Sequence, residues 1–171
     1  RTFRYTNGNG AVSSARTFAG NEWHHVTVAV DSTTGEGTMY VNGQKEATFT
    51  PGPSPIESSI FVLGQNGNLD SFWKGQIDDV RLWSTVRSAA EIDSLRTQPL
   101  TGTEDDLLAY WPLDERDGQA AANIVSEAGA YYAEYRNGVS PAREGAPIEA
   151  CVRTDADGNY THDRLRYGSG T

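Results

Sequence analysis

Two adjacent carboxylates, Asp78 and Asp79, are the first candidates for chemistry because they lie inside a strong strand pattern, residues 77–83. A glycosidase needs two such groups roughly 5 to 10 Å apart, flanking the bond to be cleaved. Neighbouring residues of a strand point to opposite faces of the sheet, so this pair cannot act as one acid/base couple. We therefore expect Asp79 to pair with Arg81 or to cap the adjoining loop, and we predict no catalytic residue here.

The histidines and the cysteine give no better basis for catalysis. His24 and His25 are also neighbours in an expected strand and face opposite sides, which excludes a metal ion shared between them. With His162 and Cys151 added, no zinc site of recognised spacing results. The chain contains no Gly-x-Ser-x-Gly sequence, the usual turn around a nucleophilic serine. We interpret the two histidines as packed or rim residues and predict that the protein is not an enzyme.

Two further sets of side chains could bind a ligand. The segment 155–159, Asp-Ala-Asp-Gly-Asn, has the composition of a calcium loop, but Arg166 stands where an EF-hand has its twelfth-position glutamate, so a hairpin turn is the better interpretation. Trp73, Tyr110 and Trp111 would stack against sugar C–H surfaces if they were exposed. Packing in the core is the default for an aromatic residue in a strand.

The composition limits the classes of protein that the chain can belong to. Its 171 residues carry 14 basic and 23 acidic side chains, and the net charge of −9 disfavours binding to nucleic acid and to anionic membranes. A single cysteine allows no internal disulfide, and no apolar run approaches the roughly 18 residues of a membrane span. The 18 glycines, 8 tyrosines and 4 tryptophans favour strands and turns, so we expect an almost wholly β protein.

Alternating apolar residues and Asn-Gly turns predict the antiparallel strands. In the strand at 23–30, Val26, Val28 and Val30 share one face, and Asn42-Gly43 is a typical two-residue hairpin turn. The expected strands are residues 1–6, 11–18, 23–30, 37–41, 44–49, 60–64, 77–83, 107–113 and 130–136. The one expected helix begins after Ser88, an N-cap with Glu91 three residues later, and buries Ile92 and Leu95.

Three motifs carry a family resemblance. They are Trp23-His-His-Val26, Tyr40-Val-Asn-Gly43, and Ile77-Asp-Asp-Val-Arg81 followed by the Ser-x-x-Glu-Ile helix. In order and spacing they resemble laminin G-like domains, the concanavalin A-like jelly-roll group that includes the pentraxins, although Asp79 stands where glutamate is commoner. The resemblance implies an all-β antiparallel β-sandwich of the concanavalin A-like jelly-roll type with one short helix, and a binding or structural role.

The same resemblance implies a candidate calcium site. In pentraxins the loop after the Leu-Gly strand supplies carboxylate and amide oxygens to calcium, which prefers hard oxygen ligands. By position, Asn66 and Asn68 fall where pentraxins have carboxylates, and Asp70 is a nearby acid. The candidate metal ligands are therefore Asn66, Asn68 and Asp70 with Ca²⁺ as the cofactor; losing two charges would weaken the affinity, and a polar turn is the alternative.

The C-terminal stretch differs from the rest of the chain. Residues 146–161, with 165–168, resemble a hairpin of carboxypeptidase-regulatory-like or Cna B-type immunoglobulin-like modules of bacterial surface proteins. We expect residues 1–117 to form the laminin G-like sandwich, without the early strands usual in that family. Residues 118–145 would complete it or open the next repeat, and residues 146–171 would be a hairpin from a following module.

These features predict a non-catalytic extracellular structural or adhesion module, one link of a larger multidomain surface protein or filament of a bacterium or archaeon. The alternative is a calcium-assisted lectin-like domain that binds carbohydrate or glycoprotein. Expected partners are neighbouring modules or subunits, joined by strand addition at sheet edges, and glycans. Neither nucleic acid nor a membrane span is expected.

Overall fold

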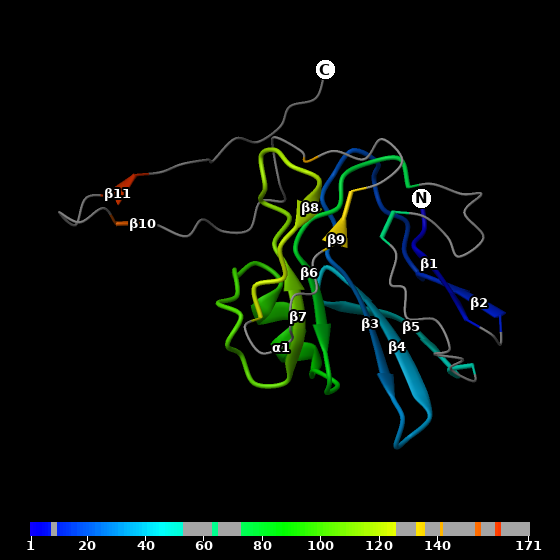
Figure 1. Ribbon diagram of the computed structural model, residues 1–171. Helices are drawn as coiled ribbons and strands as arrows, with labels where there is room; N and C mark the ends of the chain where they lie inside the picture. Colours follow the sequence, from blue (N-terminus) through cyan, green and yellow to red (C-terminus); the bar gives the residue numbers. More distant parts are fainter. Residues whose placement is uncertain are drawn as a thin grey trace. The chain divides into compact units, whose positions relative to one another are not determined.

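The computed structural model describes residues 1–7, 10–52, 63–64, 73–125, 133–135, 141, 153–154 and 160–161. The chain divides into two compact units, residues 1–76 with 86–93 and residues 77–85 with 94–171. Across the described residues the regular structure consists of antiparallel strands and one short helix (Figure 1). The predicted fold class, all-β and antiparallel with a single short helix, is confirmed.

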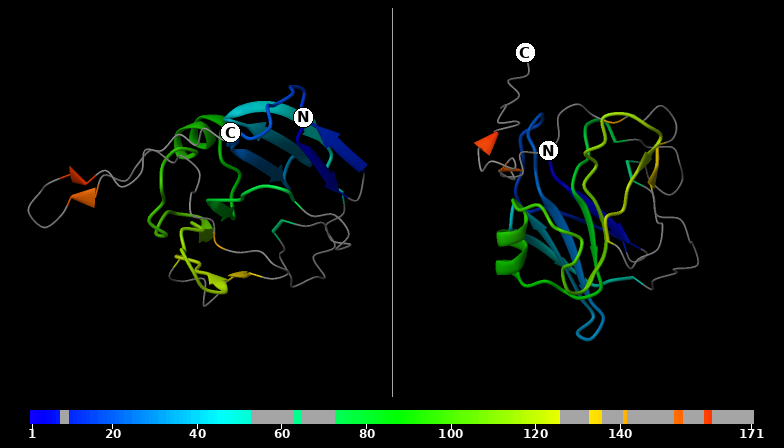
Figure 2. Two further views of the ribbon diagram at one scale, coloured as in Figure 1. Left: turned by 90° about the horizontal axis from the view of Figure 1, so that it is seen from above. Right: turned by 60° about the vertical axis from the view of Figure 1, so that its left-hand side comes forward.

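The first unit is built on a three-stranded sheet in the order β3-β4-β5 (Figures 1 and 2). The strands are β3 (Val26–Asp31), β4 (Glu36–Val41) and β5 (Gln44–Phe49). Asn42 and Gly43 join the last two with φ values of 51° and 76°, as a type I′ turn requires, and this confirms the predicted hairpin. Met39 and Val41 on the central strand are fully buried.

The predicted N-terminal hairpin also forms, but its strands are shorter than the expected 1–6 and 11–18. It pairs β1 (Arg4–Asn7) with β2 (Gly10–Ser13), and residues 8–9 of its turn lie outside the described part of the chain. The Tyr5 ring of β1 lies 4.7 Å, centroid to centroid, from the Phe49 ring of β5. The Phe49 ring in turn covers the position where a side chain on Gly37 would project. The hairpin is thus packed on the edge of the sheet that β5 forms.

The strand predicted at 23–30 begins three residues later than expected. The backbone N–H of His25 donates to the Asn42 side chain (2.9 Å), and the backbone N–H of Asn42 donates to the His25 carbonyl (2.8 Å). The turn residue therefore satisfies the backbone where a strand partner would otherwise be needed. Val26, Val28 and Val30 share one face as predicted, and all three are exposed.

The second unit contains two strand pairs besides the hairpin in the tail. β6 (Val80–Trp83) pairs with β7 (Leu107–Trp111), and β8 (Ala120–Ala121) pairs with β9 (Ala133–Glu134). Two hydrophobic clusters include residues of β7, one around Tyr110 and the other around Trp111. The buried members of the first cluster are Leu100, Leu107, Tyr110 and Val125, and those of the second are Ala109, Trp111 and Ala121.

The prediction that residues 77–79 belong to the β6 strand is wrong. Asp79 has a φ of 55°, in the left-handed region that few non-glycine residues adopt, and the strand begins only at Val80. The alternation of side chains assumed for Asp78 and Asp79 therefore does not apply to them. Whether Asp78 and Asp79 could serve as one acid/base couple therefore depends on the contacts that each carboxylate makes.

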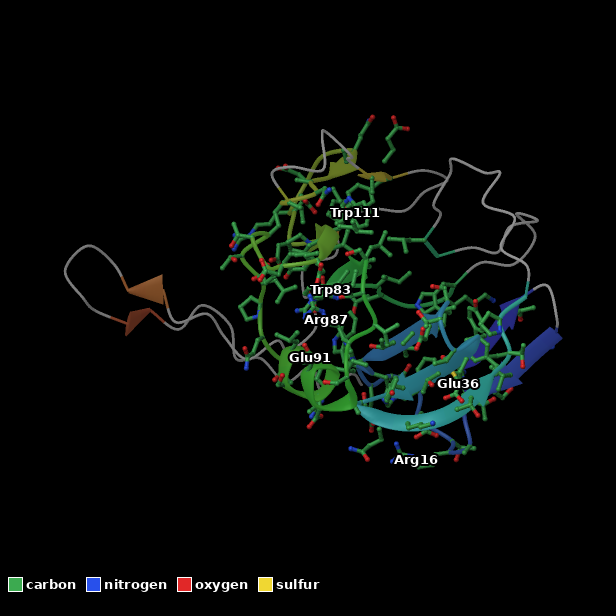
Figure 3. All side chains as sticks on the ribbon, turned by 90° about the horizontal axis from the view of Figure 1, so that it is seen from below. Arg16, Glu36, Trp83, Arg87, Glu91 and Trp111 are labelled. Atoms are coloured by element: carbon green, nitrogen blue, oxygen red, sulfur yellow. The ribbon has the colours of Figure 1, made fainter. Side chains whose placement is uncertain are left out.

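The helix α1 (Ala89–Leu95) begins where the capping pattern predicts. The Ser88 N–H donates to the Glu91 carboxylate (2.8 Å), and the Glu91 N–H donates to the Ser88 hydroxyl (3.3 Å), so each residue satisfies the other's backbone. Arg87 adds an ion pair with Glu91 (3.3 Å; both are labelled in Figure 3). As predicted, Ile92 is buried, and Leu95 packs against the Tyr110 cluster.

The remaining predictions concern parts of the chain that are described only in pieces. Residues 60–62 of the strand expected at 60–64 lie outside the described residues. In the tail, β10 (Arg153–Thr154) pairs antiparallel with β11 (Tyr160–Thr161), as a hairpin around residues 155–159 requires. The domain boundaries after residues 117 and 145 stay predictions. No helix in the described ranges has the length and apolarity needed to cross a membrane.

Candidate functional site

Asp79 forms a buried ion pair with Arg81. A guanidinium nitrogen lies 2.7 Å from the Asp79 carboxylate, and both side chains are only 7% exposed. Arg81 also donates to the carbonyls of Leu95 (2.7 Å) and Gln98 (2.6 Å), and its guanidinium carbon lies 5.3 Å from the centre of the Tyr110 ring. The predicted pairing of Asp79 with Arg81 is confirmed, and it ties β6 to the end of α1 and the loop after it.

Burial dominates the protonation of this cluster. It raises the pKa of Asp79, an effect that the Arg81 charge and a hydrogen bond from Tyr110 oppose. Burial and the neighbouring Asp79 carboxylate raise the pKa of the Tyr110 hydroxyl far above its usual range. A tyrosine held neutral and a carboxylate already paired with arginine suit a structural cluster better than a general acid or base.

Asp78 lies near a second cluster in the same unit. The Tyr135 hydroxyl donates to Glu115 (3.2 Å), whose other carboxylate oxygen accepts from the backbone N–H of Ala122 (2.8 Å). Burial, the Glu115 charge and the Asp78 charge raise the pKa of Tyr135 to about 12. Glu115 therefore accepts hydrogen bonds from the Tyr135 hydroxyl and from the Ala122 backbone N–H. The Asp78 charge raises the pKa of Tyr135, whereas the Asp79 charge raises the pKa of Tyr110, so the two neighbouring aspartates belong to different clusters.

The first unit contains a carboxylate that is almost fully buried. The Glu46 side chain, 1% exposed, forms an ion pair with the Arg16 guanidinium and also accepts from the Arg16 backbone N–H (2.9 Å). Burial by itself raises the pKa of Glu46, and the hydrogen bonds and charge of Arg16 more than offset this, so the pKa lies below its usual value. The pair fixes the segment after β2 to β5.

His24 is a packed histidine, as predicted. Its ring makes edge contacts with Phe18 and Phe3, at centroid distances of 5.2 and 5.6 Å, and its Nε2 lies 3.1 Å from the Ala19 carbonyl oxygen. Among the residues that the structure describes, no group of three or more His, Cys, Asp or Glu could hold a metal ion. Asn66, Asn68 and Asp70 lie outside the described residues, so calcium binding there stays a prediction.

The three aromatic candidates for sugar stacking lie in different environments. Tyr110 and Trp111 are 2% and 7% exposed and belong to the core of the second unit, so neither has a face open to a ligand. Trp73, in the first unit, is 56% exposed. Its indole N–H lies 3.3 Å from the Gln76 carbonyl oxygen and donates to it. Trp73 is therefore available to a ligand.

A shallow hollow of about 280 Å³, which no sequence motif indicated, lies on the β3–β4 part of the sheet. Asp31 and Glu36 lie directly opposite each other in the strand register at its edge. Hydrogen bonds from the backbone of Thr33 and Thr34 lower the pKa of Asp31, and Glu36 lies 3.8 Å from Lys45. The lining residues are Ala29, Asp31, Thr34, Glu36, Thr38, Tyr40 and Val86. Ala29 and Asp31 on β3, and Glu36, Thr38 and Tyr40 on β4, are each two positions apart and so share one face of the sheet. This alternation is the sequence signal that could have identified the hollow.

The fold is thus an antiparallel all-β one, and Asp79, Glu46 and Glu115 serve structural contacts in it. A family model described as the concanavalin A-like lectin/glucanases superfamily, of the laminin G type, matches residues 2–93, which is more than half of the chain. The chain belongs to this laminin G-like family. The resemblance to laminin G-like domains is confirmed, whereas the Cna B-type module expected at the C-terminus is not shown.

Two solved structures are similar to the chain. One, from Bacteroides ovatus ATCC 8483, carries the provisional name carbohydrate binding protein and is 20% identical, with a TM-score of 0.59; the match covers 80% of this chain and 42% of that one. The other, an S-layer domain-containing protein from Clostridium thermocellum ATCC 27405, is 25% identical with a TM-score of 0.42 and coverages of 56% and 50%. The chain therefore spans half or less of these proteins. No protein of curated description matches it.

Proposed function

We propose that the chain is a non-catalytic structural or adhesion module, one link of a larger multidomain protein or filament on a bacterial or archaeal cell surface. The observation that carries the proposal is how four of the described carboxylates are used. Asp79 and Glu46 are paired with arginines, and Glu91 and Glu115 accept from backbone amides. Acid/base catalysis needs two carboxyl groups facing one bond of the substrate, and these groups serve separate structural contacts instead.

The family and the chain's length support a place in a larger protein. The matched family model is described as concanavalin A-like lectins and glucanases, and the resemblance to laminin G-like domains implies a binding or structural role. The chain spans 42% of the Bacteroides ovatus chain that it resembles in fold. The net charge of −9 suits a soluble surface and disfavours nucleic acid as a partner.

A hydrolysis screen tests the absence of catalysis. Purified protein is incubated with a panel of polysaccharides and glycoproteins, and released reducing ends are measured against a buffer blank. We expect no turnover above the blank. Turnover that disappears in Asp78→Asn, while persisting in Asp117→Asn as the control for an exposed carboxylate, would overturn the proposal.

The second candidate function is calcium-assisted carbohydrate binding. The observation that favours it is the exposure of Trp73, which follows closely in sequence on Asn66, Asn68 and Asp70. Aromatic faces suit the C–H surfaces of sugars, and amide and carboxylate oxygens are ligands for calcium. Calorimetry with CaCl₂ tests the metal: a heat of binding in the wild type that is lost in Asp70→Asn but kept in Asp117→Asn supports it, and no heat in the wild type excludes it.

A further inference from the structure

We propose that Trp73 is the platform on which the protein binds one ring of a neutral saccharide. This inference rests on the carbohydrate-binding candidate above and names its contact residue. Trp73 belongs to the first unit and precedes β6 in the sequence. More than half of its surface is open to solvent. Such a surface matches the apolar C–H face of a pyranose.

The indole is held in place before any ligand arrives. Its N–H is bonded to the Gln76 carbonyl (3.3 Å), which restricts rotation of the side chain. Gly75 makes room for the ring: a Cβ at that position would lie 2.9 Å from the indole nitrogen and 3.5 and 3.7 Å from the neighbouring ring carbons. These atoms all belong to the five-membered ring of the indole, so Gly75 lies against that edge of the Trp73 side chain. A fixed ring loses little conformational entropy when a ligand binds.

Among the residues that the structure describes, the sequence neighbours of Trp73 favour a sugar over a protein partner. Lys74, Gly75 and Gln76 are all exposed, so polar side chains adjoin the ring in the sequence. A protein-binding patch generally joins several large apolar side chains over a few hundred Å², with charged residues depleted at its centre. A sugar needs one aromatic face and polar groups for its hydroxyls, and the Lys74 ammonium can donate to those. Tyr110 and Trp111 are buried and cannot share this role.

Substitutions at residue 73 separate stacking from the other contacts of the indole. Trp73→Ala removes the aromatic face. Trp73→Phe keeps a smaller face but loses the bond to the Gln76 carbonyl. Trp23→Ala is the matched control, because Trp23 is also an exposed tryptophan of the first unit. Unfolding midpoints of all three variants check that the fold is intact.

The experiment begins with wild-type protein on an array of neutral oligosaccharides, with calcium and with EDTA. The tightest-binding oligosaccharide is then titrated calorimetrically into each variant. We expect Trp73→Ala to weaken its affinity about tenfold or more, which corresponds to about 1.4 kcal/mol, Trp73→Phe to fall in between, and Trp23→Ala to match the wild type.

The possible failures are distinct. If the wild type binds an oligosaccharide and Trp73→Ala binds it equally well, the carbohydrate-binding function stands and the role of Trp73 is wrong. An equal loss in Trp23→Ala and Trp73→Ala would also overturn that role, since the effect would not be specific to the platform. If the wild type binds no saccharide on the array in either buffer, both the candidate function and this inference are rejected.

Discussion

Arg81 makes more structural contacts than its place in a short strand suggests. Its buried guanidinium pairs with Asp79, donates to two backbone carbonyls and lies against the Tyr110 ring. Removing two charges from water is unfavourable, and it is offset only where the geometry and the additional hydrogen bonds are good. The cluster meets that condition because the main-chain carbonyls of Leu95 and Gln98 accept from two further guanidinium N–H groups.

We predict that Arg81→Met lowers the free energy of unfolding by roughly 3 to 5 kcal/mol, because it leaves the Asp79 charge buried without its partner. Urea unfolding followed by circular dichroism measures the change. Lys45→Met is the control: Lys45 and Glu36 are 3.8 Å apart and both more than half exposed, so we expect a change of about 0 to 1 kcal/mol there. Equal effects in the two variants would contradict a dominant role for burial.

Glu46 provides a prediction about pH. Its pKa in the folded protein lies below the ordinary glutamate value of 4.5, so its charged form is favoured by folding. The stability that it contributes is fully present above that value and is lost as the pH falls through the lowered folded pKa. We therefore expect the unfolding midpoint of the wild type to fall more steeply below pH 4.5 than that of Glu46→Gln.

Thermal unfolding of both proteins at a series of pH values between neutral and acid checks this difference. Asp31→Asn serves as a comparison, since Asp31 also has a lowered pKa. In Asp31 the cause is hydrogen bonding from Thr33 and Thr34 in the adjacent surface turn rather than an ion pair. Parallel pH profiles for the wild type and Glu46→Gln would show that the ion pair with Arg16 does not contribute.

Residue type alone could not have distinguished Trp73 from Tyr110 and Trp111. All three were candidates for stacking, and only their positions in the tertiary structure decide that two are buried. The pairing of Asp79 with Arg81 could be predicted because the two residues are close in sequence. The contact of Glu46 with Arg16 spans 30 residues and leaves no local pattern.

Among the elements, the turn between β4 and β5 combines two constraints. Gly43 has a φ of 76°, and a side chain there would collide with the Asp93 carboxylate on α1. Gly35 has a similar φ of 68° but open space around it. We predict that Gly35→Ala costs about 1 kcal/mol from backbone strain, and that Gly43→Ala costs roughly 1 to 3 kcal/mol more from the collision.

Chemical unfolding of the two single variants and of Gly43→Ala with Asp93→Ala measures both parts. The double variant should recover part of the additional loss, because the carboxylate is gone while the strained φ remains. If the two glycine variants were equally unstable, the contact with α1 would contribute nothing.

Local signals explain which elements the sequence could predict. The β4–β5 hairpin depends on Asn42-Gly43, and α1 depends on Ser88 and Glu91, so each is specified by neighbouring residues. The start of β6 is different. Alternation extends back to residue 77, but the left-handed conformation of Asp79 is supported by its buried contacts with Arg81 and Tyr110, which periodicity does not reveal.

At the scale of the whole molecule, family membership could be predicted because three motifs fall in a characteristic order, whereas the C-terminal boundary could not. The hairpin of β10 and β11 shows that the tail contains paired strands. Two short strands do not define a module, because a hairpin alone is marginally stable. We propose that residues 146–171 connect the protein to a neighbouring module or subunit.

We predict that deletion of residues 146–171 lowers the mass of any assembly that the full chain forms, because the tail would supply its added strands. Light scattering over a range of protein concentrations measures the mass, and circular dichroism confirms that the truncated protein keeps its β structure. Assembly that is unchanged in the truncated chain excludes the tail as the connector.

The contact between Gly37 and Phe49 has a consequence for the history of the family. The Phe49 ring occupies the space of a side chain at position 37, while it also packs on Tyr5. Either position can therefore change only if the other compensates. In related sequences we expect the two positions to covary: a larger residue at 37 should accompany a small one at 49, and glycine should be retained wherever the aromatic ring is kept.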